Sequence, residues 1–281
     1  MDDTLPALHT FDSHTVAPNI LAFDTSTDVM SIAVGKHLGS ANEQVWTHTG
    51  PGAAQSSSSL LPAIQALMTQ AGLNFEALDA IAFGAGPGSF TGLRTSCAVA
   101  QGLGFASGRP VLGIDSLMAV AEEARAKMGS PTSAAVLAML DARMDEMYTG
   151  YYRFDSKQWL SDMPKRLVKP EDLADAGQWT PAGNVFAPYG HRLPGYTTAL
   201  APIEALPTAS AMLRLAPALL AAGHATPAAL AHPVYVRDKV AQTTQERAAL
   251  RAAAEAASSL ANALVNAPPG SVTNTEGQPS P

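Results

Sequence analysis

The stretch that decides the fold of this chain is Phe83-Gly84-Ala85-Gly86-Pro87-Gly88-Ser89-Phe90-Thr91-Gly92-Leu93-Arg94. Residues 78–83, which lead into it, have the apolar composition of a short buried strand. The glycines permit backbone angles that other residues avoid, and Pro87 fixes one turn dihedral. Ser89 or Thr91 can cap a following helix. The stretch therefore predicts a strand, a tight loop and a helix in succession.

Two interpretations of this loop are open. A strand, a glycine-rich loop and a helix N-terminus together present backbone N–H groups that can bind phosphate. Alternatively, the glycines only let the helix pack closely on the sheet. The loop lacks the Lys-Ser/Thr ending of a Walker loop, and its glycine spacing does not match a dinucleotide fingerprint. On the residues alone the structural interpretation is favoured.

Composition narrows the classes of protein that the chain can belong to. With 281 residues, 47% of them hydrophobic, it is long enough for two compact lobes. A net charge of −7 with only 15% charged residues argues against a surface that grips a nucleic-acid backbone by itself. The single cysteine, Cys97, excludes an internal disulfide framework and suits a reducing compartment.

Targeting signals are not evident in the sequence. No stretch of about 20 uninterrupted apolar residues is present, so we expect no membrane span. The first residues are acidic and polar rather than basic and then apolar, so we expect no secretory signal. A cytoplasmic location is the resulting expectation. Residues 1–17 lack periodicity and predict a loose N-terminal extension.

The first part of the chain predicts an α/β lobe. Residues 20–23 and 30–35 predict a hairpin, and residues 43–47 a third strand that is followed by a break at Gly50-Pro51-Gly52. Apolar spacing from Leu60 to Ala71 predicts a helix, with Gly72 at its C-terminal cap. After the glycine loop come a helix with small residues at every fourth position, a strand at 111–114 and a helix at 118–128. This alternation indicates a sheet covered by helices.

A second lobe repeats the pattern of the first. Residues 136–140 predict a strand that ends in Asp141, followed by a polar turn and a return strand at 147–152. A further strand and glycine turn are expected at 181–187, and a helix interrupted or bent at Pro217 over 209–222. We therefore assign residues 18–115, rejoined by 207–245, to the first lobe, 116–206 to the second, and 265–281 to a disordered tail.

Four segments together resemble one known family, the bacterial TsaB proteins, formerly called YeaZ. They are residues 19–27 (NILAFDTST), 84–94, 137–148 with its Asp-Ala-Arg, and 233–237 (PVYVR), in the same order as in that family and within a likeness over about residues 19–245. The resemblance implies the two-lobed actin-like ATPase fold, also described as the Hsp70, sugar-kinase and RNase H-like core, in which each lobe is a mixed sheet with covering helices.

The same resemblance implies a function in tRNA modification. TsaB proteins bind and support the catalytic paralogue TsaD, together with the ATPase TsaE, in placing threonylcarbamoyl on the adenosine beside the anticodon. In the family, two helices of the first lobe pack against the matching pair of TsaD, so we expect a homodimer when the partner is absent, and contact with tRNA only through the complex. The partner-binding residues that we predict on this basis are Leu60, Leu61, Ile64, Met68, Leu93, Arg94, Cys97, Ala98 and Gln101. The alternative is that both apolar stripes pack against the chain's own sheet.

Catalysis by the chain itself is not expected. The catalytic paralogue holds its metal with two histidines four positions apart on a helix, and none of the seven histidines here has that spacing. We therefore predict no metal site and no peptidase activity. In actin-like proteins the first hairpin lies against the nucleotide, so Asp24, Thr25, Ser26 and Thr27 are candidates for a residual phosphate loop, with ATP or ADP bound weakly or at the complex interface. The alternative for Asp24 is a hydrogen bond within its own turn. An autonomous ATPase or small-molecule kinase stays open as a second function, and a metallopeptidase as a third.

Overall fold

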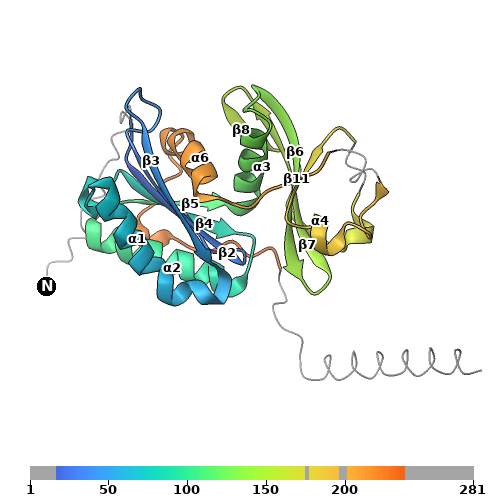
Figure 1. Ribbon diagram of the computed structural model, residues 1–281, viewed down its shortest axis with the longest axis horizontal. Helices are drawn as coiled ribbons and strands as arrows, with labels where there is room; N and C mark the ends of the chain where they lie inside the picture. The colour runs from blue at the N-terminus through green and yellow to red at the C-terminus, as the bar shows by residue number, and fades with distance from the viewer. Residues whose placement is uncertain (1–16, 175–176, 196–200, 238–281) are drawn as a thin grey trace, which may run out of the picture. The chain divides into compact units, whose positions relative to one another are not determined.

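The computed structural model describes residues 17–174, 177–195 and 201–237 (Figure 1). Five strands form the first sheet in the order β3-β2-β1-β4-β5. The strands are β1 (Ile20–Asp24), β2 (Val29–Lys36), β3 (Gln44–Pro51), β4 (Ala80–Gly86) and β5 (Val111–Asp115). β1, β2 and β3 pair antiparallel, whereas β4 runs parallel to β1 and to β5. The predicted N-terminal extension and C-terminal tail lie outside the described residues, apart from residue 17.

Helices cover both faces of the first sheet because its inner strands β1 and β4 are apolar and buried on both sides. Helices α1 (Ser56–Ala71) and α2 (Phe90–Ser107) pack on the face to which Leu21 and Phe23 of β1 point. Ile20 and Ala22 point to the other face, where α6 (Ala209–Ala221) packs. The backbone N–H of Ala209 also donates to Ser31 Oγ at 2.9 Å. A helix from late in the chain thus covers one face of the first sheet.

The second sheet is also mixed, with strand order β11-β10-β6-β7-β8 and β9 beside β7. Its strands are β6 (Ser133–Arg143), β7 (Glu146–Asp155), β8 (Gln158–Ser161), β9 (Arg166–Val168), β10 (Thr180–Gly183) and β11 (Ile203–Glu204). Helix α3 (Ser116–Lys127) packs on one face and the short α4 (Phe186–Tyr189) on the other. The 3-10 helices are η1 (Ala53–Gln55), η2 (Phe75–Ala77), η3 (Pro170–Asp172) and η4 (Ala228–Leu230). Two mixed sheets with covering helices confirm the predicted fold class, while the lobe boundaries stay a prediction.

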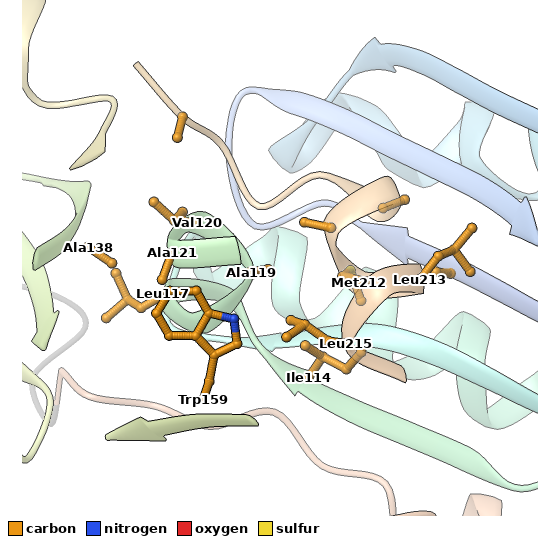
Figure 2. Packing of buried hydrophobic residues seen from close by; sticks show 14 of the residues in the cluster. Ile114, Leu117, Ala119, Val120, Ala121, Ala138, Trp159, Met212, Leu213 and Leu215 are labelled. Carbon is orange, nitrogen blue, oxygen red and sulfur yellow. The ribbon is translucent and has the colours of Figure 1, made fainter. Parts of the chain in front are cut away.

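One apolar core joins elements of the two sheets through α3 and α6. Figure 2 shows Leu117 and Val120 of α3 beside the indole of Trp159, with Met212 and Leu215 of α6 on the other side of the cluster. All five side chains are buried. Because α3 contacts both α6 and β6, the helix links the two sheets.

Glu122 supplies a buried ionic contact within this core. Its carboxylate accepts hydrogen bonds from Arg125 Nε at 2.8 Å, Arg214 Nε at 2.8 Å and Trp159 Nε1 at 3.0 Å. Burial disfavours the charged form of Glu122, but these donors outweigh it and hold its pKa below the usual value. The carboxylate therefore ties α3, α6 and β8 together as an ion.

Several sequence predictions are confirmed and others need correction. The first hairpin and the helix ending at Gly72 are present, and the Gly72 N–H bonds to the carbonyls of Met68 and Thr69. The expected break at Gly50-Pro51 is wrong, since β3 continues through Pro51; an edge strand tolerates a proline that donates no ladder hydrogen bond. Helix α6 also continues through Pro217.

Candidate functional site

The first hairpin turn holds Asp24 in a closed hydrogen-bonded setting. Oδ1 of Asp24 accepts from the backbone N–H and the hydroxyl of Ser26, both at 2.7 Å. Oδ2 accepts from the hydroxyl of Ser116, the first residue of α3, at 3.1 Å. Burial raises the pKa of Asp24 to about 6, although these three donors act in the opposite direction.

The glycine loop is shaped to fit this turn. A Cβ added at Gly84 would lie 1.8 Å from Asp24 Oδ2, and one added at Gly92 would lie 1.9 Å from the carbonyl oxygen of Thr25. The composition predicts that the strand ends at Phe83, but β4 runs on through Gly86 beside β5. The absence of side chains at these glycines lets the loop contact the turn directly.

Hydrogen bonds join the same two segments. The hydroxyl of Thr25 donates to the carbonyl of Gly92 at 2.7 Å, and the backbone N–H of Ser89 donates to the carbonyl of Ser26 at 2.7 Å. The first N–H groups at the start of α2 are the donors that a bound phosphate would use, and here the chain's own turn takes one of them. Thr27 bonds only locally, from its hydroxyl to the carbonyl of Val29. These contacts support the structural interpretation of the loop, and a nucleotide role for residues 24–27 stays a prediction.

The second hairpin turn repeats one hydrogen bond of the first. Asp141 Oδ1 accepts from the N–H of Arg143 at 2.8 Å, as Asp24 Oδ1 does from the residue two positions on. The hydroxyl of Tyr189 donates to the same oxygen at 2.8 Å, and burial together with that carboxylate raises the pKa of Tyr189 to about 12. The guanidinium of Arg143 pairs with Asp28 of the first hairpin. Each hairpin thus has an aspartate that accepts a hydrogen bond from the residue two positions on, which is the parallel that the sequence predicted.

Residues 233–237, hereafter the terminal strap, connect these features. The N–H of Val234 donates to the carbonyl of Ala85 at 2.7 Å. At its other end, Arg237 donates to the carbonyl of Ala142 at 3.1 Å and to the Glu146 carboxylate at 2.7 Å. The strap thus holds the glycine loop of the first sheet and the hairpin of the second. The sequence marked this segment as a motif, but its contacts reach back about ninety residues and more along the chain and have no local signal.

The predicted partner-binding residues fall into two groups. Five of them are buried against the chain's own sheet and are not available to another protein without rearrangement: Leu60, Ile64, Met68, Leu93 and Cys97. Of the rest, Leu61 is 41% exposed, Arg94 and Ala98 are exposed, and Gln101 is half-buried with its amide donating to the carbonyl of Ala231. The alternative weighed from the sequence accounts for the first group. A partner-binding role stays a prediction, and the outward residues of the two helices are the ones that a partner can reach in this structure.

That outward surface is almost free of charge. Helix α1 contains no Asp, Glu, Lys or Arg, and Arg94 is the single charged residue in α2. Exposed apolar side chains lie on α1 at Leu61, on α2 at Phe105 and on the adjoining η4 at Leu230, where the last two are 66% and 62% exposed. We call these outward residues of α1, α2 and η4 the uncharged face. Sequence reasoning missed Phe105 and Leu230, although counting charges along the two helices would have identified the face.

The described part of the chain lacks both a membrane-spanning helix and a cluster of metal-ligating side chains. No helix there is both long and apolar enough to span a membrane. Within residues 17–174, 177–195 and 201–237, no three His, Cys, Asp or Glu side chains gather in a way that could hold a metal ion.

Comparison with known proteins gives concordant results. Residues 50–269 match the family model described as TsaD, tRNA N6-adenosine threonylcarbamoyltransferase. The tRNA threonylcarbamoyladenosine biosynthesis protein TsaB of Escherichia coli K12 is 32% identical over 229 residues, which are 79% of this chain and 96% of that protein. The protein of the same name from Haemophilus influenzae is 32% identical over 237 residues, covering 79% and 94%.

A solved structure shows the same fold. YeaZ from Pseudomonas aeruginosa superimposes with a TM-score of 0.68 at 36% sequence identity, over 78% of this chain and 99% of that one.

Proposed function

This chain belongs to the TsaB family, whose members have the two-lobed actin-like fold, and we propose on that basis that it serves tRNA threonylcarbamoyladenosine biosynthesis as a non-catalytic subunit that binds TsaD. In this proposal TsaD transfers the threonylcarbamoyl group and TsaE joins the complex. The tRNA is reached through the complex, and the chain forms a homodimer when TsaD is absent. The compartment would be the cytoplasm.

The observation that carries the proposal is the uncharged face. Helices that face water usually have charged and polar side chains on their exposed side, and depletion of charge together with exposed aromatic and aliphatic side chains marks interaction sites. Here two neighbouring helices of 16 and 18 residues have one charge between them. Because the chain also matches the TsaD family model, its α1 and α2 have counterparts in TsaD, and like elements can pack around a pseudo-two-fold axis.

The hairpin turn supports an accessory role rather than autonomous catalysis. A nucleotide-binding turn of this fold needs its carboxylate and backbone donors directed at the ligand. Asp24 is instead engaged by Ser26 and Ser116, and the turn lies directly against the glycines of the loop. Any ATP or ADP would then bind weakly or at the junction with a partner.

The test is binding of the full-length chain to purified TsaD from the same organism, measured by calorimetry and by size-exclusion chromatography. Leu61→Glu and Ala98→Glu each place a carboxylate on the uncharged face, so we expect at least about tenfold weaker binding, which corresponds to about 1.4 kcal/mol. Gln158→Glu adds the same charge on β8 of the second sheet and should leave the affinity unchanged.

Circular dichroism and urea unfolding should show that both interface variants are folded, because Leu61 and Ala98 are exposed. A reconstituted modification assay with TsaD, TsaE, tRNA and threonylcarbamoyl-adenylate should lose activity in parallel with binding. Wild-type chain that fails to bind TsaD would overturn the proposed function, and undiminished binding by both variants would overturn the assignment of the face.

A further inference from the structure

We infer that Arg94 selects the partner of the uncharged face by pairing with a carboxylate on the partner, and so favours a heterologous partner over a second copy of this chain. The inference rests on the proposed function and specifies its chemistry. Arg94 lies in the second turn of α2 and is exposed. It is the single charge on a face that is otherwise apolar or neutral.

The guanidinium of Arg94 is held in place before any partner arrives. Its Nε donates to the hydroxyl of Tyr235 in the terminal strap at 3.3 Å, and its Cζ lies 3.8 Å from the ring centroid of Phe90. The ring centroids of Phe90 and Tyr235 lie 5.1 Å apart, so the two rings also contact each other. Because the Arg94 side chain is already ordered, less conformational entropy is lost when a partner binds.

The part of the guanidinium that recognises carboxylates is left open. Only Nε takes part in a hydrogen bond to the described residues, and no described carboxylate forms an ion pair with Arg94. The two terminal nitrogens therefore keep their N–H donors for an external acceptor. A guanidinium presents these donors as a planar fork that matches the two oxygens of a carboxylate.

Helices α1 and α2 of a second copy do not supply such a carboxylate. In a two-fold dimer the same face meets itself, and neither α1 nor α2 contains an Asp or Glu. Self-association through these helices would thus leave the Arg94 charge unpaired at the interface, which weakens the homodimer relative to a complex in which the charge is paired. A partner helix with a carboxylate opposite Arg94 avoids that cost, so one residue discriminates between the two assemblies.

The experiment compares both assemblies for the same variants. Binding of full-length chain to TsaD is measured by calorimetry, and self-association by sedimentation equilibrium, for Arg94→Ala, Arg94→Lys and Tyr235→Phe. Arg94→Ala should weaken binding to TsaD by about 30-fold or more, the loss typical of a truncated interfacial charge pair. Arg94→Lys should recover part of it, and Tyr235→Phe, which frees the guanidinium, should lose less than Arg94→Ala.

Self-association should move in the opposite direction or not at all, since Arg94→Ala removes an unpaired charge from the homodimer. Arg166→Ala on β9 is the matched control, because Arg166 is also exposed but lies on the second sheet. If Arg94→Ala weakened both assemblies equally, or left the affinity for TsaD unchanged, the inference would be overturned. The proposed function would still stand in that case as long as the wild-type chain binds TsaD. Loss of tRNA binding with unchanged TsaD binding would assign Arg94 to phosphate instead and would also overturn it.

Discussion

Replacing Asp24 with Asn changes the pH dependence of stability in a way that the geometry fixes. The Asn carbonyl oxygen can take the place of Oδ1 as acceptor for Ser26, and its amide can donate to the Ser116 hydroxyl. The fold should therefore survive. What the variant lacks is the titration, because the wild-type carboxyl has its pKa raised from 3.8 to about 6 by burial.

The sign and the size of the effect follow from that shift. Between pH 4 and pH 6 folded wild-type chain keeps a proton on Asp24 that the unfolded chain has released, so its free energy of unfolding falls as the pH rises. At about 1.4 kcal/mol per pKa unit, the rise from 3.8 to about 6 costs about 3 kcal/mol, all of it incurred by pH 7. Relative to wild type, Asp24→Asn should gain up to about that amount between pH 4 and pH 7.

Urea unfolding followed by tryptophan fluorescence at pH 4, 5, 6 and 7 measures this difference, and subtraction of the two proteins removes the titration of every other group. Ser116→Ala is the companion variant: it removes one donor to Asp24, so its stability should fall more steeply with pH than that of wild type. Stability curves for wild type and Asp24→Asn that stay parallel over the whole range would refute the reasoning. ATP turnover that needs Asp24 would separately contradict the accessory role.

Two further predictions concern packing and the buried ion. Gly92→Ala should destabilise the fold by about 2 kcal/mol or more, since its Cβ would lie 1.9 Å from the Thr25 carbonyl oxygen; Gly102→Ala on the exposed side of the same helix, with nothing within 4 Å, should instead stabilise by up to about 1 kcal/mol. Equal effects of the two alanines in thermal unfolding would contradict this. Glu122→Gln should cost about 3 kcal/mol because it leaves the Arg125 charge buried without its counter-ion. Urea unfolding at pH 7 measures the loss, and a change below about 1 kcal/mol would mean that the ion pair adds little.

Sequence patterns predict the elements of this protein better than they predict its surface. The periodicity of α1 gives an apolar stripe, and Gly72 marks where the helix ends, because both signals are local. Whether a stripe faces the chain's own sheet or a partner depends on what covers it. Leu60 is fully buried whereas Leu61, the next residue, is 41% exposed, and the sequence predicted both as partner-binding.

The glycine loop shows the same limit from the opposite side. Its composition is compatible both with a phosphate site and with close packing, and what favours packing is the lack of room for a Cβ at Gly84 and Gly92 together with the hydrogen bonds between the loop and the turn. The order of the chain likewise does not reveal that Arg237 binds the β6–β7 hairpin, since that contact depends on the relative placement of distant segments. Long-range contacts of this kind have no periodic signal.

The late position of α6 in the chain has a consequence for biosynthesis. The strands of the first sheet have all been translated once residue 115 is made, but the face that carries Ile20 and Ala22 is covered by α6, which is translated only after every strand of the second sheet. A nascent chain on the ribosome therefore carries a sheet with one open apolar face, the kind of surface that chaperones bind. A chain that ends before residue 209 would lack α6 altogether, so the face of the first sheet that carries Ile20 and Ala22 would lose that cover.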